Sequence, residues 1–223
     1  METNRRLCLW DLPLFDGVEL GIFSPVCREA AHKKHYRRGD VIFNQGDASD
    51  TLYLIKDGSF KLVRVNEDGK EVILQVACKG EVLGETALFR ESAHPVTAIA
   101  LEDARVCSLN RRRLEEVIRA SPDLAMQVIF SLGNRLYSTW EQVTELRTGS
   151  TRERVLNLLI RLAGEHGEPC SQGTIINVHL TQQDIADFVG VSRVMAARAI
   201  KELVNTNHVK RHNKYYVLKD RCF

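Results

Sequence analysis

The sequence lacks several features that would place it in a common class of protein. No apolar run approaches the about 18 residues that a membrane-spanning helix needs. The N-terminus, METNRRLCLWDLPLF, carries charges but no apolar core followed by a small-residue cleavage site, so we expect no signal peptide. These absences predict a cytoplasmic protein without a membrane partner.

Signatures of catalysis and of disulfide scaffolds are also missing. The chain has no phosphate-binding Gly-x-x-x-x-Gly-Lys loop, no HExxH and no nucleophile elbow. Its 6 cysteines are scattered without a Cys-x-x-Cys pair, and reduced thiols are the default in a chain without an export signal. We therefore expect no enzyme active site and no metal site.

Charge is nearly balanced over the 223 residues, with a net charge of +2, but it is unevenly distributed. From residue 148 onward, 11 Lys and Arg stand against 7 Asp and Glu, whereas the preceding residues have a slight acidic excess. A basic C-terminal region behind a near-neutral N-terminal region is typical of a DNA-binding module attached to a sensing domain.

The N-terminal half predicts a β-sandwich or jelly roll. Residues 1–35 have the apolar spacing of short helices, and short strand-like runs follow with a turn signal about every ten residues. Residues 41–43 lie between two Gly-Asp turns, and residues 98–109 contain two more short strands. Asp57-Gly58 and Asp68-Gly69 predict hairpin turns.

The stretch RRRLEEVIRASP has helical spacing, and a long helix follows it. Ser121-Pro122-Asp123 is an N-cap with proline at the first helical position, and the helix should run to about Arg147. Residues at a and d spacing continue along it: Ile129, Leu132, Leu136, Thr139, Val143 and Leu146. About 25 helical residues span ~40 Å, more than a small sandwich needs, which favours a dimer seam over a helix lying on its own domain.

These signals divide the chain into a strand-rich domain at 1–120, for which a sensing role is expected, a dimerisation helix at 121–147 and a basic domain at 148–223, for which DNA binding is expected. Ser150 and Glu153 form a capping box that opens the next helix. After Gly167 we expect a loop, EPCSQG, and then a strand, TIINVHL. The predicted fold class is α+β.

Residues 180–204, LTQQDIADFVGVSRVMAARAIKELV, predict a helix-turn-helix. Thr181 and Asp184 cap the first helix, Gly190 supplies the turn, and Ser192 caps the second helix. The second helix carries an apolar stripe (Val194, Met195, Ala199, Ile200, Leu203) with Arg193, Arg198 and Lys201 facing outward. A hairpin turning near His212-Asn213-Lys214 completes a winged helix. The alternative is an ordinary αα-hairpin with solvated charges.

With these motifs in order, the chain resembles the CRP/FNR family of bacterial regulators. The resemblance rests on RRGDVIFNQGD, LYLIKDGSFKLVRVNEDGKEVIL, GETALF with PVTA behind it, the long helix with STWEQV, and LTQQDIADFVGVSR. It implies a β-roll effector domain, a dimerising helix and a winged helix. It also implies a homodimer on a near-palindromic operator in double-stranded DNA, with RNA polymerase as a further partner. The alternative function is a ligand- or redox-binding module that regulates a partner protein.

The resemblance implies which residues contact DNA. Arg198 is expected to bind guanine through two parallel hydrogen bonds, and Ser192 and Arg193 to bind a base or a phosphate. Val194 stands where many relatives carry glutamate, so we expect apolar contact, for example with a thymine methyl group, and a different operator. The expected contacts also include phosphate contacts from Thr181, Gln182 and Gln183 at a helix N-terminus and from Lys214 in the wing. Lys201 is a further expected DNA contact.

In cyclic-nucleotide-binding relatives, a Gly-Glu pair and a later arginine followed by serine or threonine hold the ribose and the cyclic phosphate. Gly84 and Glu85 match the first pair, but Val96 replaces the arginine before Thr97, which disfavours cyclic AMP. His94 is a candidate replacement cation. Trp140 either fills the pocket or packs in a dimer. The expected pocket residues are Leu74, Gln75, Ala77, Gly84, Glu85, Thr97, Arg135, Thr139 and Trp140.

Other triggers remain open beside an unidentified small ligand. An iron–sulfur cluster needs four thiolates, and Cys107 matches one cluster position, but only Cys8 and Cys27 precede it near the N-terminus. Haem would need axial ligands such as His32, His35, His94 or Cys78. A thiol switch would use Cys8, Cys27 or Cys170.

Overall fold

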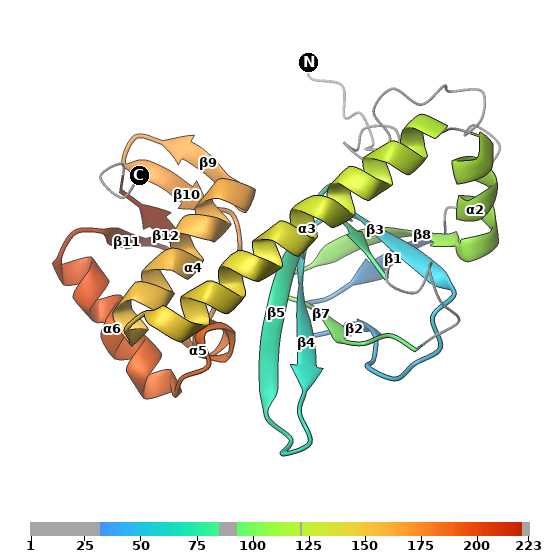
Figure 1. Ribbon diagram of the computed structural model, residues 1–223. Coiled ribbons are helices and arrows are strands. Elements are labelled where there is room, and N and C mark those ends of the chain that lie inside the picture. Colours follow the sequence, from blue (N-terminus) through green and yellow to red (C-terminus); the bar gives the residue numbers. More distant parts are fainter. Residues whose placement is uncertain (1–31, 85–92, 121, 220–223) are drawn as a thin grey trace. The chain divides into compact units, whose positions relative to one another are not determined.

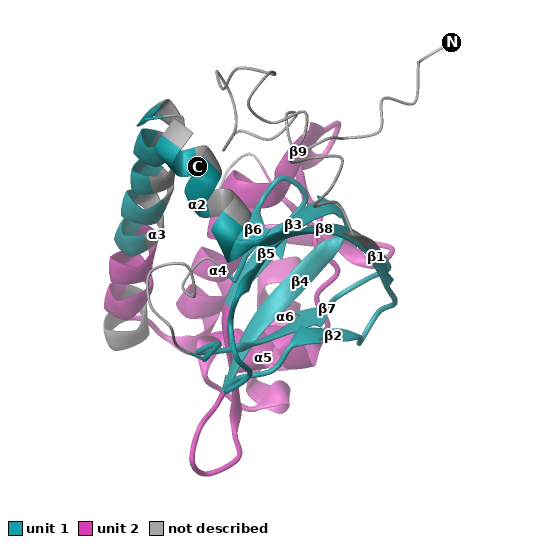
Figure 2. Cartoon of the chain, turned by 90° about the vertical axis from the view of Figure 1, so that its right-hand side faces the viewer, with its two compact units in different colours: residues 1–64, 75–137 teal, residues 65–74, 138–223 magenta. Residues whose placement is uncertain are grey.

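The computed structural model describes residues 32–84, 93–120 and 122–219 (Figure 1). The chain forms two compact units, residues 1–64 with 75–137 and residues 65–74 with 138–223 (Figure 2). The short helices predicted for residues 1–35 fall mostly outside the described residues. At the end of that stretch the prediction is wrong, because His32–Tyr36 forms strand β1, paired antiparallel with β8.

Unit 1 is built on two four-stranded sheets, except that residues 65–74, which join β4 to β5 and include their adjoining ends, are counted with unit 2. The first has the order β1-β8-β3-β6, with β8 at Ala104–Asn110, β3 at Thr51–Asp57 and β6 at Val82–Leu83. The second has the order β2-β7-β4-β5, with β2 at Val41–Phe43, β7 at Thr97–Ala100, β4 at Ser59–Val65 and β5 at Glu71–Cys78. The predicted β-roll is confirmed.

Both sheets contribute side chains to one core. Alternate residues along a strand point to opposite faces, so each strand sends its apolar set to one side. The buried cluster includes Phe43, Ile55, Phe60, Leu62, Ala77, Leu83 and Val106. Tyr36 meets the Phe60 ring edge-on, with the ring centroids 6.1 Å apart.

The Asp57-Gly58 turn does not close a hairpin, contrary to the prediction. Strand β3 pairs with β8 and β6, whereas β4 pairs with β7 and lies beside β5, so the chain passes at Gly58 from one sheet to the other. Gly58 has a φ of +84°, and a Cβ there would lie 2.6 Å from the Cβ of Ala104. Only glycine fits this corner.

Two helices follow the last strand of unit 1. Helix α2 covers Arg111–Ala120, and helix α3 runs without a break over Pro122–Thr148 (Figure 1). The long helix was predicted over this range, and its N-cap Ser121 lies outside the described residues. Among the residues that the structure describes, no helix is long and apolar enough to cross a lipid bilayer.

Unit 2 contains a winged helix. Helix α4, Thr151–His166, opens with the predicted capping box of Ser150 and Glu153. Helices α5, Gln182–Val189, and α6, Arg193–Asn205, follow. Its sheet has the order β11-β12-β10-β9, at Val209–His212, Tyr215–Leu218, Gly173–Ile176 and Gly167–Cys170.

Two predictions between α4 and α5 were wrong in detail. Half of the expected loop EPCSQG, residues 168–170, belongs to strand β9, because Gly167–Cys170 pairs with β10. The strand predicted over TIINVHL ends at Ile176 as part of β10, although Val178 and Leu180 beyond it remain buried. Val178 and Leu180 are thus buried without belonging to a strand.

The corner at Gly58 predicts a large difference between two glycine substitutions. Gly39 has a φ of +89° with nothing within 4 Å of a built Cβ. Gly39→Ala should lower the free energy of unfolding by about 1–2 kcal/mol, the cost of a left-handed backbone. Gly58→Ala should lower the free energy of unfolding by about 1–3 kcal/mol more than Gly39→Ala does, because its methyl group overlaps Ala104. Urea unfolding followed by circular dichroism measures both, and equal losses would contradict the proposed close approach.

Candidate nucleic-acid interface and effector site

The turn between α5 and α6 is held by caps that the sequence predicts. The backbone N–H of Thr181 donates to Oδ2 of Asp184 at 2.9 Å, and the N–H of Asp184 donates to the Thr181 hydroxyl at 3.1 Å. Gly190 ends α5 in the left-handed region at φ 68°, and the Ser192 hydroxyl accepts from the N–H of Met195 at 3.3 Å. These bonds satisfy N–H groups that a helix end leaves without partners.

Arg154 of α4 adds a contact that sequence reasoning missed. Its Nη1 donates to the carbonyl oxygen of Val189 at 3.1 Å, at the C-terminal end of α5. A cation is favourable there because the helix dipole places partial negative charge at that end. No spacing signal links residues so far apart in sequence, so only the folded chain reveals this bond.

Helix α6 presents two different faces. Ala196, Ala199, Ile200 and Leu203 are buried against the rest of the domain, whereas Arg193, Arg198 and Lys201 are exposed. The prediction that Val194 and Met195 belong to the apolar stripe was wrong, because both are exposed. The buried stripe begins at Ala196, so the first turn of α6 projects from the domain.

Arg198 is paired along its own helix. Its Nε donates to Oε1 of Glu202 at 3.3 Å, and the arginine side chain is 83% exposed. Residues four apart lie one above the other on a helix, which is the sequence signal that identifies this pair. With Nε engaged, Nη1 and Nη2 are the groups that suit two parallel bonds to a guanine edge.

The residues expected at phosphates differ in their surroundings. The Thr181 hydroxyl donates to Oδ2 of Asp184 as well as accepting from its N–H, so capping occupies it. Gln182 is half-buried, and Gln183 is exposed with Nε2 donating to Oδ1 of Asp187 at 2.8 Å. The structure therefore leaves the glutamines better suited than Thr181 to a phosphate.

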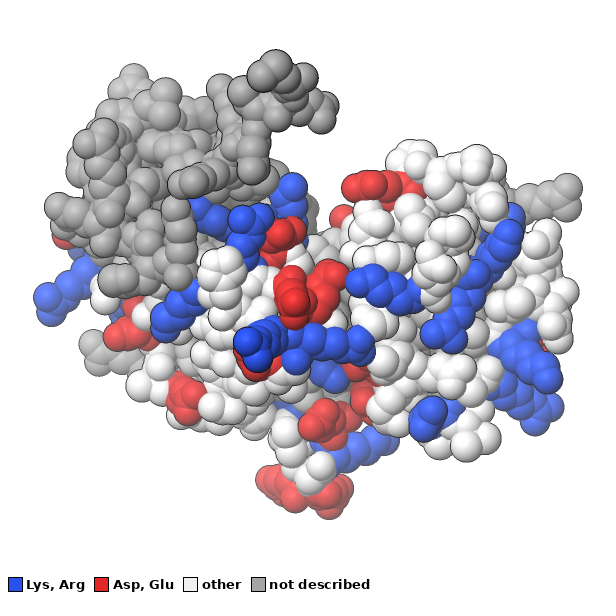
Figure 3. Space-filling view, turned by 180° about the vertical axis from the view of Figure 1, so that it is seen from behind, with Lys and Arg blue, Asp and Glu red and all other residues white. Residues whose placement is uncertain are grey.

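The wing extends from the same domain. Strands β11 and β12 pair antiparallel around a turn in which Asn213 has a φ of 54°. The Nζ of Lys214 lies 5.2 Å from the centre of the Tyr215 ring, and Nζ of Lys210 donates to Oε1 of Gln172 at 2.7 Å. Figure 3 shows Lys and Arg side chains in separate groups on one face of the molecule.

The residues predicted to bind an effector in unit 1 begin at Gly84. This buried glycine has a φ of +84°, and a Cβ there would lie 2.8 Å from the carbonyl oxygen of Thr51. Glu85, its predicted neighbour in the site, lies outside the described residues. On β5, Ala77 is fully buried in the core, Gln75 is half-buried and Leu74 is exposed.

The segment before β7 is tied down by packing and hydrogen bonds. The His94 ring stacks on Phe43 with centroids 3.7 Å apart, and its Nδ1 lies 3.2 Å from Oγ of Ser49. Burial lowers the pKa of His94, against the opposing effect of Asp47 and Asp50. The ring is therefore neutral at neutral pH and supplies no fixed positive charge.

The two residues after Pro95 are also engaged within unit 1. Val96 packs against the apolar core, and Oγ1 of Thr97 accepts from the N–H of Gln45 at 2.9 Å. The position expected to hold a phosphate-binding cation is thus occupied by a side chain that belongs to the core.

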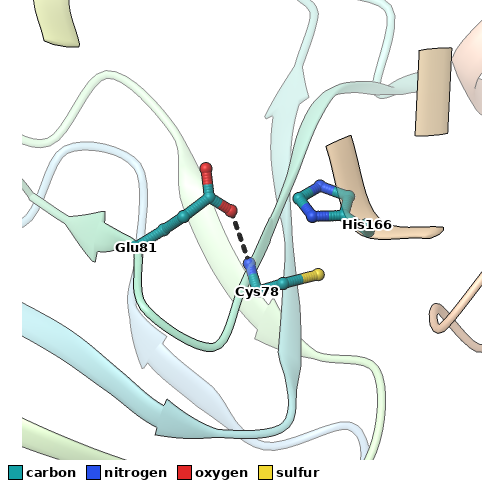
Figure 4. A group of neighbouring side chains, drawn as sticks. All are labelled: Cys78, Glu81 and His166. Carbon is teal, nitrogen blue, oxygen red and sulfur yellow. Dashed lines mark hydrogen bonds between the residues drawn. The ribbon is translucent and has the colours of Figure 1, made fainter. Parts of the chain in front are cut away.

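Several of the cysteines and histidines considered for metal cofactors lie on strands. Cys107 is buried in β8, and His35 is exposed on β1. Cys78 ends β5, where its N–H donates to Oε2 of Glu81 at 2.7 Å and closes the turn to β6 (Figure 4). Cys8 and Cys27 lie outside the described residues, as does the side chain of His32.

Three further pocket predictions fall on α3. Thr139 and Trp140 belong to unit 2 and are exposed, with 60% of Trp140 accessible. The side chain of Arg135 lies outside the described residues. Sequence reasoning missed the neighbouring Phe130 and Tyr137, which are also exposed, because it followed only the a and d spacing.

Comparison with known proteins matches both units to described domains. Residues 33–121 match the cyclic nucleotide-binding domain, and residues 153–222 match the Crp-like helix-turn-helix domain. The CRP-like cAMP-activated global transcriptional regulator of Mycobacterium tuberculosis is 26% identical over 207 residues, which are 93% of this chain and 92% of that protein. The cAMP-activated global transcriptional regulator CRP of Salmonella typhimurium is 28% identical over 188 residues, 84% of this chain and 89% of that protein.

Solved structures agree with these matches. The c-di-GMP responsive global regulator CLP of Xanthomonas campestris superposes with a TM-score of 0.72 at 25% identity, covering 90% of this chain and 99% of that chain. The matched proteins are transcription regulators, so the comparisons favour DNA over a partner protein as the target. Regulators with these two domains bind DNA and dimerise. With both domains present in the same order, the chain belongs to the CRP/FNR family of effector-responsive, DNA-binding transcription regulators.

Proposed function

We propose that the chain acts as a homodimer that places two copies of α6 in successive major grooves of a near-palindromic operator. The observation that carries this proposal is the exposed face of α6, where Arg193 and Arg198 project from a helix whose other face is buried. Two recognition helices about 34 Å apart fit half-sites one turn of DNA apart. Its place of action is the cytoplasm, where the operator is, and RNA polymerase is the proposed further partner.

Within each half-site, Arg198 reads guanine, and Ser192 and Arg193 contact a base or a phosphate. Exposed basic and amide side chains around α6 and the wing contact the backbone: Gln182, Gln183, Lys201 and Lys214. Phosphate contacts position the domain, whereas contacts to base edges provide the specificity.

The dimer seam is proposed along α3. Ile129, Leu136 and Val143 recur at intervals of seven and are all exposed in the single chain, with Phe130 65% accessible. A second copy of α3 would remove this apolar surface from water, at about 25 cal/mol per Å² buried. The proposed division of labour is sensing by residues 1–120, dimerisation by the helix at 121–147 and DNA binding by residues 148–223.

The effector is proposed to be a small molecule bound in unit 1 around Gly84, Gln75 and Thr97. Binding would change how the α3 helices pair and so bring the two α6 helices into register with the grooves. Cyclic AMP is disfavoured because Val96 packs in the core and His94 is neutral, so neither supplies the cation that a cyclic phosphate requires.

Selection of bound sequences from random DNA tests the function itself. The selection is run with and without added ligands and with and without air. In at least one of these conditions the dimer should enrich one palindromic motif whose half-site contains guanine. Enrichment of no motif under any of these conditions would count against DNA as the target and favour a protein partner.

Arg198→Ala should weaken binding to that operator by about 10- to 100-fold and abolish the preference for guanine at one position, because a bidentate contact is lost. Lys201→Ala is the matched control on the same helix. It should weaken binding to all sequences about equally and lower the slope of affinity against salt by about one phosphate contact. Fluorescence anisotropy at several salt concentrations separates the two effects, and retained guanine preference in Arg198→Ala would refute the assignment.

Leu136→Glu should convert the dimer into a monomer, because a charge at a seam position would have to be buried without a partner. Glu141→Arg, outside the a and d positions of the same helix, should leave the dimer intact. Sedimentation velocity measures both. A dimeric Leu136→Glu variant would place the seam elsewhere.

Cyclic AMP at millimolar concentration should give no saturable heat in calorimetry and no rise in the melting temperature, since neither Val96 nor His94 supplies a cation for its phosphate. The Salmonella relative, which is cAMP-activated, serves as the positive control. Micromolar binding to this chain would show that another group neutralises the phosphate.

A further inference from the structure

Val194 is an unusual surface residue. Among the described residues it is the most accessible large apolar side chain, with 78% exposed. It lies in the first turn of α6, between Arg193 and Met195, and the buried stripe of the helix begins only at Ala196. Packing within the domain therefore gives no reason for a β-branched apolar residue at this position.

The basic side chains around Val194 suit binding to DNA, and Val194 itself suits contact with an apolar group on a base. Arg193, Arg198 and Lys201 are exposed on the same helix, which disfavours an apolar protein surface as the partner. Valine neither donates nor accepts a hydrogen bond, and in the major groove the apolar group of a base edge is the C5-methyl of thymine.

We propose that Val194 recognises the C5-methyl group of a pyrimidine in each operator half-site. This inference rests on the proposed function, in which α6 enters the major groove. It concerns the methyl group itself rather than the base pair, because Val194 has no polar atom that tells thymine from 5-methylcytosine.

The position of that methyl group follows from helix geometry. Val194 and Arg198 are four residues apart, so they lie on one face and are separated by about 6 Å along the axis of α6. Bases along one strand are about 3.4 Å apart. The methyl group should therefore lie within about two base steps of the guanine that Arg198 reads.

One consequence is a response to DNA methylation. A cytosine at this position lacks the methyl group, and 5-methylcytosine restores it. Methylation of cytosine at C5 should thus strengthen binding to a half-site with cytosine there.

The experiment removes or adds single methyl groups in the DNA. In the selected operator, each thymine is changed in turn to deoxyuridine, which removes only the methyl group, and the dissociation constant is measured by anisotropy. At one thymine near the guanine, the loss should be about fourfold, the value for burying one methyl group. In a second arm, 5-methylcytosine should bind about fourfold better than cytosine at the same position.

Two valines on α6 give a matched pair of variants. Val194→Ala should reduce both methyl effects to below about twofold, since most of the apolar contact is gone. Val204→Ala changes a valine that is 41% exposed at the other end of the helix and should leave both effects unchanged. Circular dichroism should show both variants folded, because exposed valines contribute little to stability.

The outcomes separate this inference from the proposed function. If no sequence is enriched, the proposed function fails. If the operator is bound with its guanine preference but no methyl group changes affinity, or if Val194→Ala keeps the methyl effect, this inference alone is overturned.

Discussion

The burial of one face of α6 is the interaction on which the C-terminal domain depends. Ala196, Ala199, Ile200 and Leu203 fix the rotation of the helix about its axis, because all four must face the domain core. Because that face is buried, the side chains of Arg198 and Val194 point away from the domain and are exposed. In the proposed complex, the packing of α6 on the domain core therefore determines which of its side chains contact DNA.

The local features around this helix could be predicted from the sequence. Capping boxes and the glycine turn depend on residues three or four apart, and Thr181, Gly190 and Ser192 all adopt the expected conformations. The bond from Arg154 to Val189 could not be predicted, because it joins residues 35 positions apart on different helices. The sequence placed Val194 both in the apolar stripe and at the DNA, because an apolar residue within a helical repeat gives the same pattern whether it starts the stripe or precedes it. Its exposure decides against the stripe.

The same division holds in unit 1. Strand positions follow from alternating residues and turn signals, so the β-roll could be predicted with most of its strands. Which strands pair could not, as the corner at Gly58 illustrates. An Asp-Gly pair normally indicates a hairpin, yet here the adjoining strands belong to different sheets. That choice depends on the contact with Ala104, far along the chain, and not on the turn residues. The candidate site has a feature of the same kind. Burial of the His94 ring, which stacks on Phe43, lowers the pKa of His94, and that packing depends on the fold.

Two valines show why burial has to be known before a residue type is interpreted. Both Val96 and Val194 stand where the family resemblance leads one to expect a charged side chain. Val96 packs on the core of the β-roll, so its role is satisfied inside the protein and the site loses a cation. Val194 is exposed, so packing inside the protein does not account for it, and its proposed partner is the operator. In the proposed function, the first substitution changes which effector fits by removing a contact, whereas the second changes which operator fits by adding one. A regulator altered at both positions should answer to its own signal and its own DNA sequence while keeping the same fold.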